Sequence, residues 1–161
     1  MAANPGALRF NTDSLKLELY DGNQWVELVA TSADSQTGGA RGLFGGGWLN
    51  SGTTNVIEYI TISTTGNSQD FGDLLYSAQF VSGCSNSTRG LFAGGFAHIG
   101  SSLTNVIQYV TISSTGNSQD FGDLTTASST NGEGGCSNAT RGLFAKGITP
   151  SVTNAIDYIT I

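Results

Sequence analysis

The sequence of 161 residues predicts an all-β repeat protein, and three observations lead to this fold class. A phrase at residues 54–74, TNVIEYITISTTGNSQDFGDL, returns at residues 104–124 with changes only at 108, 110 and 114, and a third copy, TNAIDYITI, opens at residue 153. The tetrad Arg-Gly-Leu-Phe returns at a similar spacing, starting at Arg41, Arg89 and Arg141. Gly, Ser, Thr and Asn fill the spaces between short β-branched runs, which is typical of a β protein with many turns. A period of about 50 residues indicates units that bury their apolar faces only against neighbouring units.

Each repeat is expected to contain four strands, as the central copy shows. The elements in chain order are an apolar strand over residues 89–95, a strand over 105–112, a turn over 113–117, a short outer strand over 119–124 that is irregular at Gly122, and a further strand within 127–138. The strand at 105–112 is rich in Val, Ile, Tyr and Thr and is apolar on both faces, so we expect it to be covered on both sides. Four strands per unit is the stoichiometry of a propeller blade.

The order of these elements resembles the kelch repeat. A Gly-Gly pair follows an apolar strand, a Tyr-containing strand comes next, and a short strand with an aromatic residue ends the unit. The resemblance covers about residues 31–161, and Phe71 and Phe121 stand where the family has Trp. It implies a divergent kelch-like β-propeller with blades at residues 31–76, 77–125 and 126–161.

Residues 1–30 form a separate segment, for which alternation predicts strands at 7–11, 15–20 and 24–28. Asp21-Gly22 before Asn23 is a strong hairpin-turn signal. The string resembles a β-hairpin element that recurs in virion proteins of tailed bacteriophages; the matching positions are Arg9, Phe10, Asn11, Thr12, Lys16, Leu17, Glu18, Tyr20, Asp21, Gly22 and Trp25. The phrase TISTTGNSQDFGDL, together with TRGLF, likewise resembles repeats of marine and cyanobacterial phage structural proteins. The resemblance implies a docking element on a virion.

The N-terminal segment can also be aligned as a blade that lacks its first strand, while the third repeat lacks its last. On this alignment the chain holds two full and two partial blades. Either the ends meet in a small four-bladed ring, or further copies of the chain complete it. An isolated open array is disfavoured because it exposes unpaired strand edges.

Composition and charge exclude several classes of protein. The net charge is −6 and only six residues are Lys or Arg, so no basic stripe exists for nucleic acid, and an anionic membrane surface is disfavoured. No apolar run approaches the roughly 18 residues of a membrane span, and no secretory signal is visible. Cys84 and Cys136 occupy matching places in two repeats and are interpreted as small buried side chains, with a disulfide open only if neighbouring units bring them within bonding range.

No catalytic residue, metal or cofactor is expected. Asp70-Phe71-Gly72-Asp73 and its copy contain the letters of a kinase motif but no catalytic loop accompanies them. Calcium is a weak alternative at Asn67, Asp70 and Asp73, whose spacing does not fit an EF-hand. Recurrence in register favours an architectural role for the charged repeat positions, which are Arg41, Arg89, Arg141, Asp70, Asp73, Asp120 and Asp123. The hypothesis is that each Arg bridges to a carboxylate such as Asp73 or Asp123, or to turn carbonyls, and locks one blade to the next.

Binding is expected at the loops where the repeats differ. The candidates are Trp48, Leu49 and Asn50 in the first repeat, Phe96, His98 and Ile99 in the second, and residues 148–150 in the third. These loops leave the same end of their blades and should converge on one rim. Trp48 and Phe96 suit stacking on sugar rings or anchoring a protein partner, or else pack in a core. His98 has no Ser, Cys or carboxylate partner recognisable from spacing, so it is interpreted as a loop residue.

The functional expectation is a non-enzymatic structural protein of a phage particle, as a capsid decoration protein or a tail or fibre component. Its partners would be other virion proteins and copies of itself, and its location the virion. The alternative is a carbohydrate-binding propeller that attaches to a host-surface glycan. A glycosidase would require paired carboxylates, which Asp34, Glu58, Glu133 and Asp157 do not form in sequence.

Overall fold

The structure, a computed structural model, describes residues 4–28, 41–97, 100, 102–129, 134–147 and 151–161. The chain divides into two compact units, Met1–Ser35 and Gln36–Ile161, close to the boundary drawn from the sequence. All regular elements of the described residues are β-strands, which confirms the all-β fold class.

The N-terminal unit is an antiparallel sheet of three strands, β1 (Leu8–Asn11), β2 (Lys16–Tyr20) and β3 (Trp25–Glu27), in the order β1-β2-β3. The three strands expected from alternation are therefore present. Gly22 has φ +103°, which favours glycine, and the Asp21 carboxylate accepts hydrogen bonds from the backbone N–H groups of Asn23 and Gln24. These hydrogen bonds lower the pKa of Asp21.

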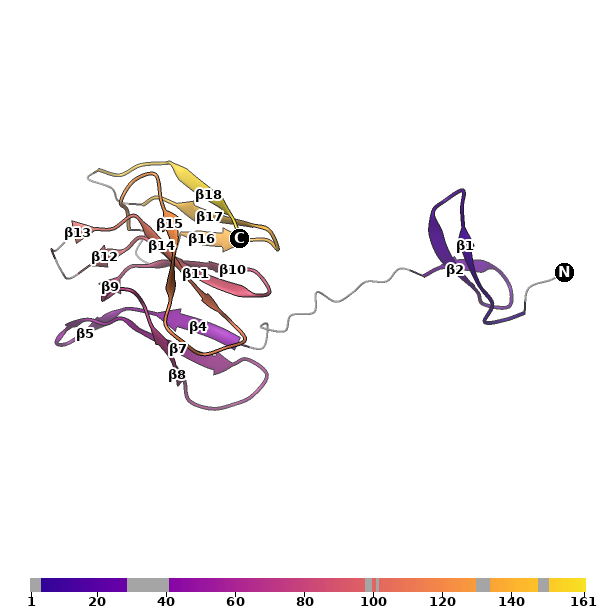
Figure 1. Cartoon of the computed structure of the whole chain (residues 1–161), viewed down its shortest axis with the longest axis horizontal. Coiled ribbons are helices and arrows are strands. Elements are labelled where there is room, and N and C mark those ends of the chain that lie inside the picture. The colour runs from indigo at the N-terminus through magenta and orange to yellow at the C-terminus, as the bar shows by residue number, and fades with distance from the viewer. Residues whose placement is uncertain (1–3, 29–40, 98–99, 101, 130–133, 148–150) are drawn as a thin grey trace. The chain divides into compact units, whose positions relative to one another are not determined.

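The repeat unit contains one larger antiparallel sheet per repeat. The first sheet is β4 (Arg41–Gly45), β7 (Val56–Thr61) and β8 (Gln69–Asp73); the second is β10 (Ser82–Ser85), β11 (Arg89–Ala93), β14 (Val106–Thr111) and β15 (Gln119–Asp123); the third is β16 (Gly135–Ser137), β17 (Arg141–Ala145) and β18 (Ile156–Thr160). Figure 1 shows these three sheets layered in chain order, with the four-stranded sheet in the middle.

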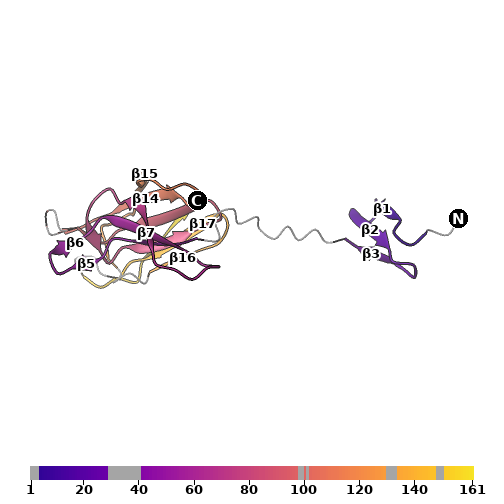
Figure 2. The same ribbon diagram turned by 90° about the horizontal axis from the view of Figure 1, so that it is seen from below.

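Short strands extend from one end of these layers. A hairpin of β5 (Trp48–Leu49) and β6 (Gly52–Thr53) belongs to the first repeat, and β9 (Ala78–Gln79), β12 (Phe96–Ala97) and β13 (Ser102–Leu103) form a small sheet in the order β13-β12-β9. Figure 1 places β5, β12 and β13 at the same end, and Figure 2 shows the β5-β6 hairpin projecting there. We call this part the hairpin end.

The apolar core lies between the layers. Between the first and second sheets the buried residues are Ile57, Phe71, Leu74, Phe92 and Val110; between the second and third they are Leu91, Ala93, Ile107, Leu124 and Phe144. The second sheet is thus covered on both faces, as expected for its strongest strand.

The outer strands are irregular where the sequence indicated. The register of β7 with β8 shifts between Ile57 and Glu58, and that of β14 with β15 shifts at the same point of the repeat. Gly72 and Gly122 have φ values of +147° and +143°. The bulge turns Phe71 and its copy Phe121 toward the core, where each ring meets a Tyr edge at 5.9 and 6.0 Å between ring centres.

The expected ring is not present within the described part of the chain. Its sheets form an open stack, and only the second has four strands. The count of two full and two partial blades therefore stays a prediction. The N-terminal segment is a compact unit with its own three-stranded sheet, and β18 is an edge strand of the third sheet, whose repeat contains no counterpart of QDFGDL.

Candidate binding surface

The three repeat arginines stack on tyrosines of their own sheets. The guanidinium carbons of Arg41, Arg89 and Arg141 lie 4.7, 4.9 and 5.0 Å from the ring centres of Tyr59, Tyr109 and Tyr158. Cation–π contacts of this kind contribute roughly 0.5–2 kcal/mol each. Arg41 also donates from Nη1 to the carbonyl oxygen of Ile112 in the second repeat, at 2.8 Å. Arg41 therefore joins two sheets through a carbonyl, which is the second of the two partners proposed from the sequence.

The carboxylate partner proposed for these arginines is wrong. Within the described ranges the ion pairs are Arg9–Glu18, Lys16–Glu27 and Lys146–Asp157, and none includes a repeat arginine. The strand register explains this result: Arg41 lies opposite Thr61, which places the ring of Tyr59 beside the guanidinium. Asp70 and Asp73 belong to β8, which pairs with β7 on its other side.

The repeat aspartates lie on the outer strands. Asp70, Asp120 and Asp123 are exposed and Asp73 is half-buried. The backbone of Asp73 is bound by the next repeat: its N–H donates to Asn117 Oδ1 at 3.0 Å, and its carbonyl accepts from Ser118 N at 2.8 Å. Among residues that the structure places, no three His, Cys, Asp or Glu side chains are arranged to hold a metal ion.

The turn after the second strand encloses a polar cavity in two repeats. The first, of about 340 Å³, is lined by residues 59–62 and 64–69, and the second, of about 290 Å³, by residues 109–111, 114–117 and 119, which are copies of most of them. In each, a Tyr hydroxyl donates to a Gln carbonyl oxygen, Tyr59 to Gln69 at 2.5 Å and Tyr109 to Gln119 at 2.6 Å. Because the lining recurs with the repeat, we attribute these cavities to the architecture.

Four of the six candidate binding residues, Trp48, Leu49, Asn50 and Phe96, lie at the hairpin end. Trp48 and Leu49 are 62% and 53% exposed and Asn50 is exposed, so the first loop does not pack in a core. Phe96 is half-buried because β12 pairs with both β9 and β13. His98 and Ile99 lie outside the described residues, as do residues 148–150.

Phe80 is an addition to this surface that the sequence does not reveal. It follows β9 with φ +60°, an uncommon conformation for a bulky residue, and is 43% exposed. The root of the β5-β6 hairpin lies beside β9, because Gly47 N–H donates to the carbonyl of Ala78 at 2.8 Å. Trp48, Leu49 and Phe80 thus belong to one end of the repeat unit.

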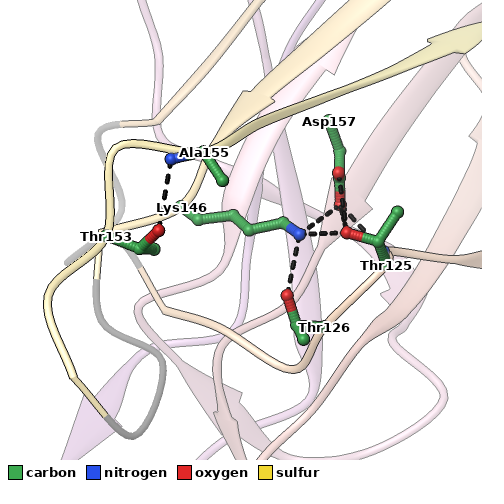
Figure 3. A network of polar contacts seen from close by, with 6 residues as sticks. All are labelled: Thr125, Thr126, Lys146, Thr153, Ala155 and Asp157. Atoms are coloured by element: carbon green, nitrogen blue, oxygen red, sulfur yellow. Dashed lines mark hydrogen bonds and ion pairs between the residues drawn. The ribbon is translucent and has the colours of Figure 1, made fainter.

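A buried charge pair of the third repeat is hydrogen-bonded to Thr125, at the end of the second repeat, as Figure 3 shows. Lys146 Nζ lies 3.0 Å from Asp157 Oδ2 and donates to the hydroxyls of Thr125 and Thr126. The Lys146 and Asp157 side chains are only 3% and 12% exposed. Burial acts to raise the pKa of Asp157, but hydrogen bonds from Thr125 and Lys146 outweigh it, so the pKa is lowered.

The sequence contains a signal for this pair. Lys146 stands where the earlier repeats have Gly46 and Gly94, and Asp157 stands where the second has Gln108. Gln108 Oε1 accepts from the backbone N–H of Leu75, and Asp157 accepts from that of Thr125, the next copy of the same position. The pair is therefore a variant of a conserved contact between repeats, and its charges are already neutralised.

The two cysteines are free thiols. Cys84 is half-buried, and burial, with the neighbouring Cys136 thiol as a smaller cause, raises its pKa to about 11. Cys136 is exposed, contrary to the expectation of two buried side chains. The difference arises because Cys84 packs over Gly142 of the third sheet, while no sheet of the described chain follows Cys136.

The N-terminal sheet has one apolar face. Its register sets Leu8 opposite Leu19, Phe10 opposite Leu17 and Leu19 opposite Val26. The large apolar side chains exposed on it are Leu8, Phe10, Leu17, Val26 and Leu28, at 41–61%. We call this the N-terminal apolar face.

The opposite face of the N-terminal sheet is polar and tied together. Arg9 bonds Glu18 at 2.7 Å and covers the Trp25 ring at 4.1 Å, and Asn11 Nδ2 also donates to Glu18. The bonds from Arg9 and Asn11 lower the pKa of Glu18. These contacts stabilise the sheet while its apolar side stays uncovered by the unit itself.

In the described part of the chain, no helix reaches the length and apolarity that crossing a membrane requires. No protein-family model and no curated protein matches this chain.

Proposed function

We propose that this protein is a non-enzymatic structural component of a tailed-phage particle, held to the virion by its N-terminal sheet and displaying its repeat unit. The observation that carries the proposal is the N-terminal apolar face, presented by a unit whose residues resemble a virion β-hairpin element.

The physical argument is that a sheet of three strands with one open apolar face gains stability by docking. Small sheets are marginally stable until a hydrophobic face is covered. Complete burial of a fully exposed Leu, Val or Phe side chain is worth roughly 1.5–3 kcal/mol. The five such side chains on this face are 41–61% exposed, so covering each contributes about half of that. A flat virion surface with a complementary apolar strip is a suitable partner.

The residues that carry the resemblance divide between the two faces in a way that fits docking. Arg9, Asn11, Glu18 and Trp25 form the polar face and hold the strands together. Phe10 and Leu17 point to the other side and are 58% and 45% exposed. One set thus maintains the sheet and the other is available to a partner.

Sedimentation of the full chain with particles that lack it tests this proposal. Wild-type protein should sediment with the particles, and Phe10→Glu, which places a charge on the apolar face, should stay in the supernatant. Glu27→Gln on the opposite face is the matched control and should sediment normally. Normal sedimentation of Phe10→Glu, with the strand signal in circular dichroism retained, would show that this face is not the docking surface.

The alternative function is glycan binding at the hairpin end, and the exposure of Trp48 supports it. An aromatic ring that is 62% exposed on a short hairpin can stack on the apolar face of a sugar ring. On a glycan array, wild-type protein would give saturable signals that Trp48→Ala removes, while Leu75→Ala, an exposed position on another loop, would not. Absence of any glycan signal from the wild-type protein would eliminate this alternative.

A further inference from the structure

Equivalent residues of the three repeats differ in exposure according to their place in the stack. Phe44, Phe92 and Phe144 occupy the same repeat position and are 60%, 7% and 1% exposed. Ile57, Ile107 and Ile156 occupy another and are 0%, 1% and 60% exposed. The phenylalanine position is exposed only in the first sheet, and the isoleucine position is exposed only in the third sheet.

Each sheet therefore has two distinct faces, which we name by their residues. The leading face carries Phe44, Ile60 and Ile62 in the first sheet and their copies in the others; the trailing face carries Leu43, Ile57 and Tyr59 and their copies. Within the chain the trailing face of the first sheet packs on the leading face of the second, and the trailing face of the second packs on the leading face of the third. The leading face of the first sheet and the trailing face of the third remain uncovered within the described chain.

Both internal interfaces depend on a glycine of the leading face. A Cβ on Gly90 would lie 2.9 Å from Leu43 Cδ1, and a Cβ on Gly142 would lie 2.8 Å from Cys84 Sγ. The third member of this set, Gly42, meets only Ile60 and Phe44 of its own sheet. The first sheet thus keeps the glycine that a neighbouring trailing face needs, without having that neighbour.

The interface between the first and second sheets also contains a polar contact whose residues recur, unpaired in this way, at the open ends. Arg41 of a trailing face donates to the carbonyl of Ile112 on the adjoining leading face. The copies of these residues at the open ends are Arg141 and Ile62. Arg141 stacks on Tyr158 of β18, so its guanidinium lies on the uncovered trailing face of the third sheet.

We infer that the trailing face of the third sheet of one copy packs on the leading face of the first sheet of a second copy, in the register of the two internal interfaces. Arg141 then donates to the Ile62 carbonyl of the other copy, and Cys136 lies over its Gly42. A second copy is the occupant because, apart from the counterparts of Phe71 and Leu74, it presents the residues that already cover these faces inside the chain. The inference is independent of any attachment to a virion.

The number of copies follows from closure. A head-to-tail interface of this kind produces a ring when the rotation closes and a filament when it does not. Propellers contain about four to eight sheets, and six is the only multiple of three in that range. With three sheets per chain, two copies close the ring.

Light scattering on the full-length protein tests the pairing through two variants. Wild-type protein should have twice the 16.6 kDa mass of the chain. Phe44→Lys, whose ammonium can pair with Glu58 on the adjacent strand, blocks the leading face, and Ile156→Lys blocks the trailing face. Each should be monomeric with an unchanged strand signal in circular dichroism. Val152→Lys, which changes an 85% exposed residue outside both faces, should stay dimeric.

Mixing the two lysine variants distinguishes head-to-tail pairing from pairing of like faces. Phe44→Lys keeps an intact trailing face and Ile156→Lys an intact leading face, so the mixture should form dimers through one remaining junction although neither variant does so alone. A monomeric wild-type protein at all concentrations, or a mixture that stays monomeric, would overturn the inference. So would a dimer unaffected by either substitution.

The register is tested by a disulfide between copies. In a Cys84→Ser background, Gly42→Cys should cross-link with Cys136 of the second copy on mild oxidation, giving a covalent dimer on a non-reducing gel. Adding Phe44→Lys should remove the cross-link. A dimeric protein that gives no cross-link would overturn the proposed register.

Discussion

Lys146 Nζ lies 3.0 Å from Asp157 Oδ2, and these residues occupy the two repeat positions that are Gly94 and Gln108 one unit earlier. Gly46 and Gly94 have φ values of +72° and +64°, whereas Lys146 is not in this left-handed region. The third repeat has thus exchanged a left-handed glycine and an amide for a charged pair that reaches the same backbone N–H of the preceding repeat.

This exchange predicts strong coupling between the two positions. Lys146→Gly leaves a carboxylate without its cation, and Asp157→Gln leaves a buried ammonium, so each should lower the free energy of unfolding by roughly 3–5 kcal/mol. The double variant restores the arrangement of the second repeat and should lose much less than the sum of the two changes. Urea unfolding followed by circular dichroism gives the coupling energy, and additive losses would contradict the proposed exchange.

The lowered pKa of Asp157 predicts loss of stability in acid. A carboxyl group whose pKa is lower in the folded state stabilises the protein above its unfolded pKa, near 3.9, and this contribution is lost as the pH falls through the folded value. The urea midpoint should therefore fall below about pH 4. The Lys146→Gly/Asp157→Gln double variant should show a smaller fall over the same range, and an equal fall would assign the acid sensitivity to other groups.

Gly72 and Gly122 occupy the same repeat position, and only Gly72 contacts the next repeat, so substitutions at the two positions can be compared to measure that contact. Both have positive φ, so Ala at either position adds backbone strain of roughly 1–3 kcal/mol. A Cβ on Gly72 would also collide with the carbonyl of Gly116 in the next repeat, while a Cβ on Gly122 meets nothing within 4 Å. Gly72→Ala should therefore be less stable than Gly122→Ala by a further 1–3 kcal/mol or so. Equal midpoints in thermal unfolding would show that the Gly116 contact does not stabilise the fold.

The two thiols should react at different rates. Because the pKa of Cys84 is raised to about 11, almost none of it is thiolate at neutral pH, and it is half-buried. Cys136 is exposed within one chain. In a monomeric Phe44→Lys variant, a thiol reagent should modify Cys136 rapidly and Cys84 slowly, as peptide mass analysis would show. Faster modification of Cys84 would contradict the packing of the second sheet on the third.

The repeat strands could be predicted from sequence because their β-branched runs and glycines are local signals. The strand at 105–112, its double coverage and the irregularity at Gly122 all follow from such patterns. The partner of each repeat arginine could not be predicted in this way. Both the Tyr59 ring and the Asp73 carboxylate lie within one repeat of Arg41. Only the pairing of Arg41 with Thr61 decides that the guanidinium contacts the ring.

The open ends of the stack could not be predicted either. The third repeat opens with the same residues as the others, and only the layering shows that Ile156 is exposed while Ile57 is buried. Phe80 has no flanking signal for its positive φ. The pair of Lys146 and Asp157 could have been predicted from the sequence, because two aligned repeat positions are both charged only in the third repeat.

The turn of the second repeat completes the edge of the first sheet. Gly116 N–H donates to the Phe71 carbonyl at 2.7 Å, and Ser118 N–H to the Asp73 carbonyl at 2.8 Å. During translation, the backbone carbonyls of β8 thus stay unpaired on this edge until residue 118 has left the ribosome. Chains truncated before that residue should aggregate through the unpaired strand edge, and chains truncated a few residues after it should not.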